Sequence, residues 1–248
     1  MHPSWLLPSW HPRSEIKSLI TTRHGGVSAP PYDSMNLAMH VGDDSVHVLA
    51  NRRLLTMDLP SEPVWLNQVH STDVVDADLP HALVPVADAA VTTRADCVLA
   101  AMTADCLPVL LADEAASVIG IAHAGWRGLA FGVIEATLQL MKLKAPTATR
   151  WYAYLGPAIG PKHFEVGPEV KDIFVSRHPQ AATAFKVVGS EDKYLANLYA
   201  LARMRLQLAG VDNIAGGSDC TYANQNFYSY RRDKATGRMA SLIWRASQ

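Results

Sequence analysis

The chain has 248 residues, of which 49% are hydrophobic and 18% charged, and its formal net charge is −1. This balance is typical of a soluble globular protein, and it excludes the strong excess of lysine and arginine on which sequence-independent nucleic-acid binding depends. No uncharged apolar stretch reaches the ~18 residues that a membrane-spanning helix needs. Three cysteines are too few for a disulfide framework, and Met1–Glu15 lacks the basic segment and apolar core of a secretory signal. We therefore expect a cytoplasmic protein with neither a nucleic-acid nor a membrane partner.

The N-terminal part of the chain predicts a turn and then a helix. Ile20–Ser28 (ITTRHGGVS) predicts a short strand that enters a Gly-Gly turn. Asp44 or Ser45 can cap a helix that ends before the next proline, with Arg52 and Arg53 on its solvent face. The apolar residues at helical spacing, which predict its packing face, are Val46, Leu49, Ala50, Leu54 and Met57.

From residue 64 to residue 122 the pattern changes to short apolar runs. Several of these runs are continuous instead of alternating, which predicts strands that are covered on both faces. We therefore expect a central sheet. The predicted strands are Val64–Leu66, Val74–Val75, Val86–Thr92, Val98–Met102, Leu107–Ala112 and Val118–Ala122.

The second half of the chain predicts helices and strands in alternation. Helical spacing returns over Gly128–Lys142, and Trp151–Leu155 predicts a strand. A proline at its first position predicts a helix over Pro168–Arg177. Asn197 can cap a further helix, and the tail ends in an apolar strand. Because the sequence contains no repeat, linker or low-complexity segment, we predict one domain over residues 1–248.

Three residues with metal-binding or nucleophilic side chains follow apolar runs. Cys106 and His123 each end a predicted strand, which would place them side by side at equivalent ends of adjacent strands, and His70 ends a shorter run. Two imidazoles and a thiolate form a three-ligand set with an open fourth position, as in a catalytic zinc site. Without a metal, the same residues could form a cysteine nucleophile with a histidine base. A free cysteine is also commonly buried and inert, and spacing alone does not decide between these interpretations.

Residues near these runs could bind substrate. Arg23 with the Gly25-Gly26 turn could form an anion-binding nest, although adjacent glycines also mark a plain tight turn, and Arg127 lies at a predicted helix start, where an anion is stabilised. Asp73 and Asp105 could orient a ligand imidazole, or could simply end strands. The remaining candidates, aromatic rings that could stack on a base and histidines in glycine-containing loops, are Tyr222, Phe227–Tyr230, His24 and His163. The other histidines, His40 among them, have no predicted role.

The sequence resembles the YfiH-type, or laccase-domain, family over nearly its whole length. The resemblance implies a single-domain α+β fold, with mixed sheets packed between helix layers, related to cysteine-hydrolase-like toxin domains. It also implies that His70, Cys106 and His123 are the metal-binding and catalytic residues, with zinc or, alternatively, copper. The motifs that carry it are TTRHGGVS at Thr21–Ser28, NLAMHVGDD at Asn36–Asp44, NQVHSTDV at Asn67–Val74, TADCLPVLLAD at Thr103–Asp113, HAGWRG at His123–Gly128, GPAIGPKHFEVGPEV at Gly156–Val170 and FYSYRRDKATGRMASLIW at Phe227–Trp244.

The resemblance implies several activities. The first is phosphorolysis of adenosine, inosine and methylthioadenosine, with nucleoside and phosphate as small-molecule partners, together with deamination of adenosine. Alternatives are a Cys/His hydrolase that acts on a peptidoglycan precursor, a copper-dependent polyphenol oxidoreductase, and a protein that only binds metal or a partner. The copper alternative is weakened because the sequence has no H-x-H pair of the kind found in multicopper sites. The oligomeric state is not predicted.

Overall fold

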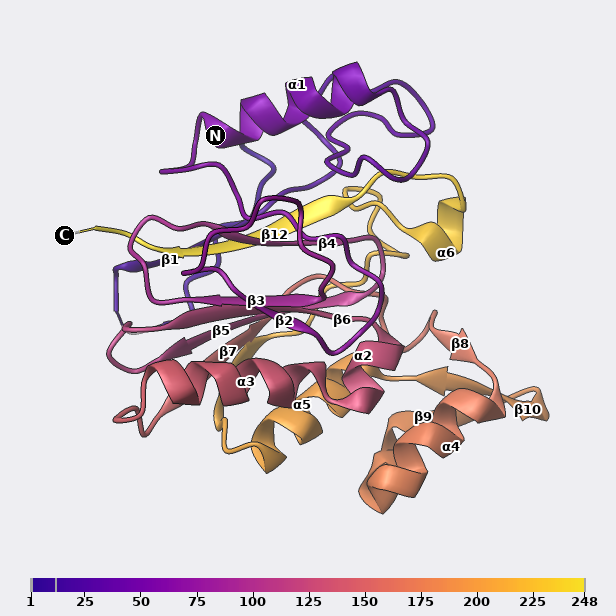
Figure 1. Ribbon diagram of the computed structural model, residues 1–248. Helices are drawn as coiled ribbons and strands as arrows, with labels where there is room; N and C mark the ends of the chain where they lie inside the picture. The colour runs from indigo at the N-terminus through magenta and orange to yellow at the C-terminus, as the bar shows by residue number, and fades with distance from the viewer. Residues whose placement is uncertain (1, 12, 248) are drawn as a thin grey trace.

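The computed structural model describes residues 2–11 and 13–247 and stacks four layers (Figure 1). Helix α1 (Ser45–Thr56) lies on a three-stranded antiparallel sheet. That sheet packs on a six-stranded sheet, and helices α3 (Val133–Lys144) and α5 (Leu198–Leu208) cover the far face of the larger sheet. The three-stranded sheet has the order β1 (Ile16–Ile20), β12 (Met239–Arg245) and β4 (Leu99–Thr103).

The six-stranded sheet is mixed. Strand pairs β11/β7 and β2/β3 are parallel, and the other neighbours are antiparallel. The order is β11 (Asn213–Gly216), β7 (Trp151–Leu155), β5 (Leu107–Asp113), β6 (Ile119–Ala124), β3 (Ala89–Thr92) and β2 (Val74–Asp76). The predicted α+β fold with mixed sheets between helix layers is confirmed, although Val64–Leu66 forms only an isolated bridge from Val64 to Leu99.

The continuous apolar runs are explained by burial on both faces of each strand. In β5, Leu110 contributes to the core between the two sheets, whereas Leu111 packs toward the helices α3 and α5. In β4, Leu99 faces the space between the sheets and Ala100 faces α1. Successive side chains of a strand point to opposite faces, so a strand covered on both sides needs apolar residues throughout.

A smaller unit lies beside the α3 and α5 layer. Strands β8 (Glu165–Val166), β10 (Ser190–Ala196) and β9 (Phe185–Val188) form a sheet next to helix α4 (Pro168–Arg177) and the short helix η1 (Pro179–Ala184). The bounds of α4 agree with the prediction. The strands of this unit, β11 and the short helix α6 (Tyr230–Asp233) were not predicted.

Helix α1 forms as predicted, but with a different buried face. The Asp44 side chain accepts a hydrogen bond from the Val46 N–H, so the predicted cap is present. Val46 is nevertheless 68% exposed, whereas Asn51 is fully buried. The Asn51 amide donates to Ser28 Oγ and to the carbonyls of residues 34 and 36, and its oxygen accepts from the N–H of residue 27. A polar residue therefore anchors this helix. Arg52, predicted to be solvated, stacks over a tryptophan ring instead.

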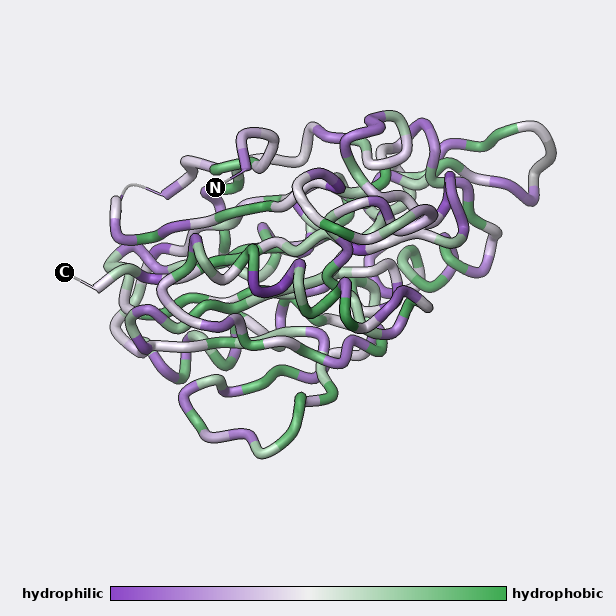
Figure 2. Tube along the Cα trace, turned by 90° about the horizontal axis from the view of Figure 1, so that it is seen from above, coloured by the Kyte–Doolittle hydropathy of each residue, from purple (hydrophilic) through white to green (hydrophobic). Residues whose placement is uncertain are grey.

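The helix predicted over Gly128–Lys142 is two helices. Helix α2 (Trp126–Phe131) ends at Gly132, whose φ of 106° lies in the left-handed region, and α3 follows at once. Glycine is suited to this break because a side chain disfavours positive φ. In the described part of the chain, no helix combines the length and apolarity that crossing a bilayer requires. Figure 2 shows hydrophobic stretches running through the body of the molecule, with many outer turns hydrophilic.

Candidate metal centre

His70, Cys106 and His123 converge in space, and we call them the candidate trio. Their ligand atoms all lie within 4.8 Å of one another, and Cys106 Sγ is 3.7 Å from His70 Nε2. The two imidazole rings meet edge to face, with centroids 4.8 Å apart. Ligands bound at 2.0–2.3 Å to a tetrahedral zinc ion are separated by about 3.5 Å, so the donor set fits a zinc ion with small adjustments. His70 is exposed, Cys106 half-buried and His123 buried.

The strands bring the trio together in a different way from the prediction. Cys106 lies in the turn between β4 and β5, and β4 belongs to the other sheet. Cys106 therefore leads into β5, while His123 lies near the end of β6. Because β5 and β6 are antiparallel, with Pro108 opposite His123, the start of one strand meets the end of the other. The proximity was predicted correctly, but the predicted equivalent ends were wrong.

Asp88, whose role was not predicted from the sequence, connects two members of the trio. Its buried carboxylate accepts hydrogen bonds from the backbone N–H groups of Val69, His70 and Ser71, at 3.1, 2.9 and 2.6 Å. It also bonds His123 Nδ1 at 2.7 Å. Three successive N–H groups form a nest for this carboxylate, which holds His70 at a φ of 63°. The bond to Nδ1 leaves Nε2 of His123 as the nitrogen available to a ligand.

The trio and Asp88 form a strongly polarised group. Burial raises the pKa of the Cys106 thiol, but His123 and His70 outweigh this effect and lower it. Burial lowers the pKa of His123, but the Cys106 sulfur and the Asp88 carboxylate outweigh that effect and raise it. Burial also raises the pKa of Asp88, and hydrogen bonds, the one from His123 foremost, bring it well below its usual range. A thiolate beside an imidazole is the form in which cysteine binds a metal or acts as a nucleophile.

Within the described residues, neither of the two acids proposed to orient an imidazole forms a hydrogen bond or ion pair with one. The carboxylate of Asp105 accepts from Thr221 Oγ1 and from the Arg231 N–H, both at 2.6 Å. These bonds fix the turn before Cys106, where Asp105 has a φ of 95°. Asp73 uses its carbonyl oxygen to accept the N–H of Asp88. The orienting role belongs to Asp88, and its sequence signal was a carboxylate within the apolar run Val86–Thr92.

Because Gly125 has no side chain, it leaves free the space in which the side chains of the trio meet. A Cβ at this position would lie 2.7 Å from His70 Cδ2 and 3.1 Å from Cys106 Sγ. A separation below about 3.0 Å requires the neighbour to move. The glycine of the HAGWRG motif is therefore required by close approach.

The trio opens into a cleft of about 390 Å³. His40, Gln68, Tyr230 and Arg238 also line it. The Gln68 side chain bonds both the N–H and the carbonyl of a β4 residue at 2.8 Å, which fixes that wall. Tyr230 belongs to the aromatic segment predicted to contact a base, whereas His40 and Arg238 were not predicted.

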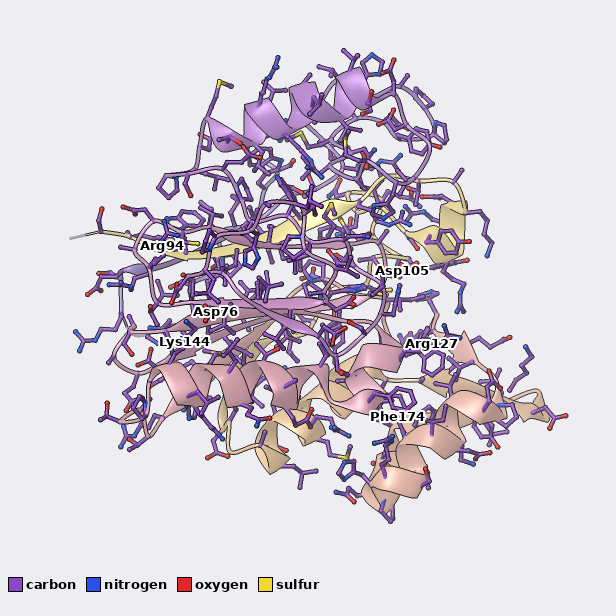
Figure 3. All side chains as sticks on the ribbon, viewed as in Figure 1. Asp76, Arg94, Asp105, Arg127, Lys144 and Phe174 are labelled. Carbon is purple, nitrogen blue, oxygen red and sulfur yellow. The ribbon has the colours of Figure 1, made fainter. Side chains whose placement is uncertain are left out.

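None of the residues proposed from the sequence to hold an anion lines this cleft. Arg23 pairs with Asp33 at 3.1 Å, and the Gly26 N–H donates to Ser34 Oγ at 3.2 Å. These bonds hold the Gly25-Gly26 loop against residues 33 and 34, and the Val27 N–H donates to Asn51 of α1, so the turn serves packing. Arg127 is exposed on α2, at the same end of the molecule as Asp105 (Figure 3).

The candidates His24, His163 and Tyr222 lie outside the cleft as well. His24 bonds an asparagine side chain at 3.1 Å. His163 stacks on Tyr222, with ring centroids 4.6 Å apart, and its Nδ1 lies 3.3 Å from Cys220 Sγ. Sequence proximity to a glycine loop therefore did not identify cleft residues.

The layers and the donor set define a class of single-domain α+β proteins in which a His, Cys and His set opens into a cleft. The chain belongs to the YfiH-type, laccase-domain family. The family model described as multi-copper polyphenol oxidoreductase laccase matches residues 17–246.

Relatives and solved structures agree with this family over nearly the full chain. The chain is 48% identical to the purine nucleoside phosphorylase YfiH of Escherichia coli over 242 residues, covering 96% of this chain and 98% of the relative. It is 46% identical to a purine nucleoside phosphorylase of Pseudomonas aeruginosa, covering 97% and 98%. The crystal structure of Neisseria meningitidis protein NMB0706 matches with a TM-score of 0.92 and 48% identity, covering 98% and 99%. YlmD from Geobacillus stearothermophilus matches with a TM-score of 0.87 and 32% identity, covering 94% and 93%.

Proposed function

We propose that this chain is a zinc-dependent purine nucleoside phosphorylase that also deaminates adenosine to inosine. It would cleave adenosine, inosine and methylthioadenosine with phosphate to the free base and a sugar 1-phosphate. The observation that carries the proposal is the convergence of His70, Cys106 and His123 on one cleft, in a chain 48% identical to a relative named purine nucleoside phosphorylase. The trio would hold the zinc ion.

The chemistry divides between the ion and the residues around it. Zinc bound in such a site supplies an electrophilic centre and lowers the pKa of a bound water to about 7. Asp88 orients His123 and, through the backbone, His70, so the donor atoms are arranged before any ligand arrives. Tyr230, which is 54% exposed, offers a ring face on which a purine can stack. Gln68 is held by its own hydrogen bonds and shapes the wall of the cleft.

The test is an assay of the purified protein with adenosine, with and without phosphate. We expect adenine only when phosphate is present and inosine in both cases. Cys106→Ala should lose both products, while Cys220→Ala, which removes a thiol outside the cleft, should keep them. Absence of both products from the wild-type protein with its metal bound would refute the proposal. Metal analysis of protein purified without added metal distinguishes zinc from the copper alternative.

A second candidate is a metal-independent Cys/His hydrolase acting on a peptidoglycan precursor. The observation that favours it is the Cys106, His123 and Asp88 arrangement, in which the carboxylate orients the imidazole beside a thiol of lowered pKa. This order of groups is that of a nucleophile, its base and an orienting acid. Chelator treatment separates the two candidates, because a cysteine hydrolase should keep its activity when less than half an equivalent of metal remains.

A further inference from the structure

Arg238 is a half-buried cation in the cleft wall without a carboxylate partner. Its Nη1 donates to the carbonyls of Thr236 and Gly237 at 2.9 and 3.0 Å, and its backbone N–H donates to Asn36 Oδ1. Within residues 2–11 and 13–247, its Nε and Nη2 form no hydrogen bond and no ion pair. Other arginines do form ion pairs: Arg23 with Asp33, Arg205 with Glu135 and Arg232 with Asp233.

A partly buried guanidinium without a counter-charge is energetically unfavourable. Burial lowers the pKa of Arg238, and the partial compensation comes from Cys106, Asp105 and Tyr230. A guanidinium stays charged at any physiological pH, and these groups of the protein balance its charge only in part. The bonds from Nη1 to the carbonyls of Thr236 and Gly237 fix the orientation of the guanidinium. They leave Nε and Nη2 without a hydrogen-bond acceptor in the described part of the chain. The Tyr230 ring, 5.8 Å from the guanidinium carbon, restrains it further.

A second possible hydrogen-bond donor lines the cleft with Arg238, and a further arginine lies next to one of the lining residues. His40 lines the same cleft, and its pKa is lowered by burial and then by the charges of Arg238 and Arg52. Arg52 Nη2 lies 4.0 Å from the sulfur of Met102, which also lines the cleft. A lowered pKa keeps His40 neutral near pH 7, and a neutral imidazole can still donate one N–H to an anion that Arg238 binds.

We propose that Arg238, assisted by His40, forms a tetrahedral-oxyanion subsite in the cleft of the candidate trio, and that inorganic phosphate is its ligand. A guanidinium matches phosphate because two parallel N–H groups can bond two oxygens, and Nε and Nη2 are such a pair. This inference rests on the proposed function, since phosphorolysis requires phosphate in the same cleft as the nucleoside. It assigns the role to residues other than Arg23, Gly25, Gly26 and Arg127.

The experiment measures phosphate binding by calorimetry and, separately, the KM values for phosphate and adenosine. Arg238→Gln should weaken phosphate binding and raise the phosphate KM by about tenfold or more, because a charge-assisted, two-pronged contact is lost. The adenosine KM and the metal content should stay within about twofold of wild type. Arg127→Gln, which removes an exposed arginine at the same end of the molecule, is the matched control and should change neither KM.

Two further comparisons keep the test decisive. Arg238→Lys retains the charge but not the paired donors, so it should raise the phosphate KM several-fold, and it replaces Arg238→Gln if that variant does not fold. An unchanged phosphate KM in a folded Arg238 variant, or an equal rise in both KM values, overturns the inference. If wild-type protein binds phosphate through Arg238 but cleaves no nucleoside, the subsite stands and the proposed function fails. If phosphorolysis continues with an unchanged phosphate KM in Arg238→Gln, the function stands and the subsite fails.

Discussion

Gly125→Ala tests the geometry of the candidate trio with the smallest possible side chain. The added Cβ would lie 2.7 Å from His70 Cδ2 and 3.1 Å from Cys106 Sγ, whereas ordinary contacts between such atoms begin near 3.4 Å. His70 must therefore move by about 0.5–1 Å or turn away from the shared centre. The Gly125 backbone has a φ of −59°, so alanine itself is tolerated there. We expect metal affinity to fall by about 10- to 100-fold, the range found when the support of a metal ligand is disturbed.

The assay is competition with a zinc chelator of known affinity, combined with thermal unfolding. Gly120→Ala is the matched control, because it lies on the same strand β6 and its Cβ would meet the flexible end of Met141 at 2.8 Å. That variant should lose some stability but keep its metal affinity. A folded Gly125→Ala protein with wild-type metal affinity would refute the reasoning, since His70 and Cys106 would then not meet at this point.

Three further predictions follow from polar side chains that make several hydrogen bonds. Asp88→Asn should weaken metal binding by about 10- to 100-fold in the same chelator assay, because His123 loses its orienting carboxylate; equal affinity would count against that role. Burial raises the pKa of the Asp78 carboxyl, but hydrogen bonds, the one from Lys144 first, hold this pKa well below its usual range. The ionised carboxylate therefore stabilises the folded protein above pH ~4, and this stabilisation is lost as the pH falls. Asp78→Asn should thus lower the free energy of unfolding, measured with urea, by about 2 kcal/mol at pH 7 and by progressively less below pH 4. A decrease that does not depend on pH would contradict this explanation. Asn51→Ala should cost about 3 kcal/mol in urea unfolding, because several buried backbone groups lose their partner, and a cost below about 1 kcal/mol would disprove its anchoring role.

The Asp78 prediction is informative because its site is remote from the cleft. Lys144 contacts both Asp76 and Asp78, at 2.6 and 2.8 Å. Figure 3 shows Asp76 and Lys144 at the end of the molecule opposite Asp105. A loss of stability in Asp78→Asn without a change in metal affinity would therefore separate folding effects from effects on the trio.

Features with local causes were predictable from the sequence. The helix over Pro168–Arg177 has its proline at the first position, and Asn197 caps α5 by accepting the N–H of Ala200. The burial of Asn51 was not predictable, because its partners lie 15 to 24 residues away and come together only in the folded chain. Hydrophobic spacing therefore predicted α1 but not the face that it buries.

The candidate site also has features that the sequence predicts and features that only the folded structure reveals. Cys106 and His123 could be placed together because apolar runs mark strands, and neighbouring strands bring their ends together. Arg238 and Arg23 are alike in sequence terms, and only the fold shows that one pairs with Asp33 while the other faces the cleft. Whether an arginine has an ion-pair partner depends on residues that are distant in the sequence, so no local sequence pattern predicts it.

Two residues of the site have backbone conformations that residues other than glycine rarely adopt. His70 has a φ of 63° and Asp105 a φ of 95°, and each conformation costs about 1–3 kcal/mol. Carboxylates offset both: Asp88 binds the N–H groups around His70, and the Asp105 carboxylate binds Thr221 and the N-terminal end of α6. These charge-assisted bonds are made entirely within the protein. The positions of His70 and of the turn before Cys106 are therefore set by folding and do not depend on a ligand to hold them.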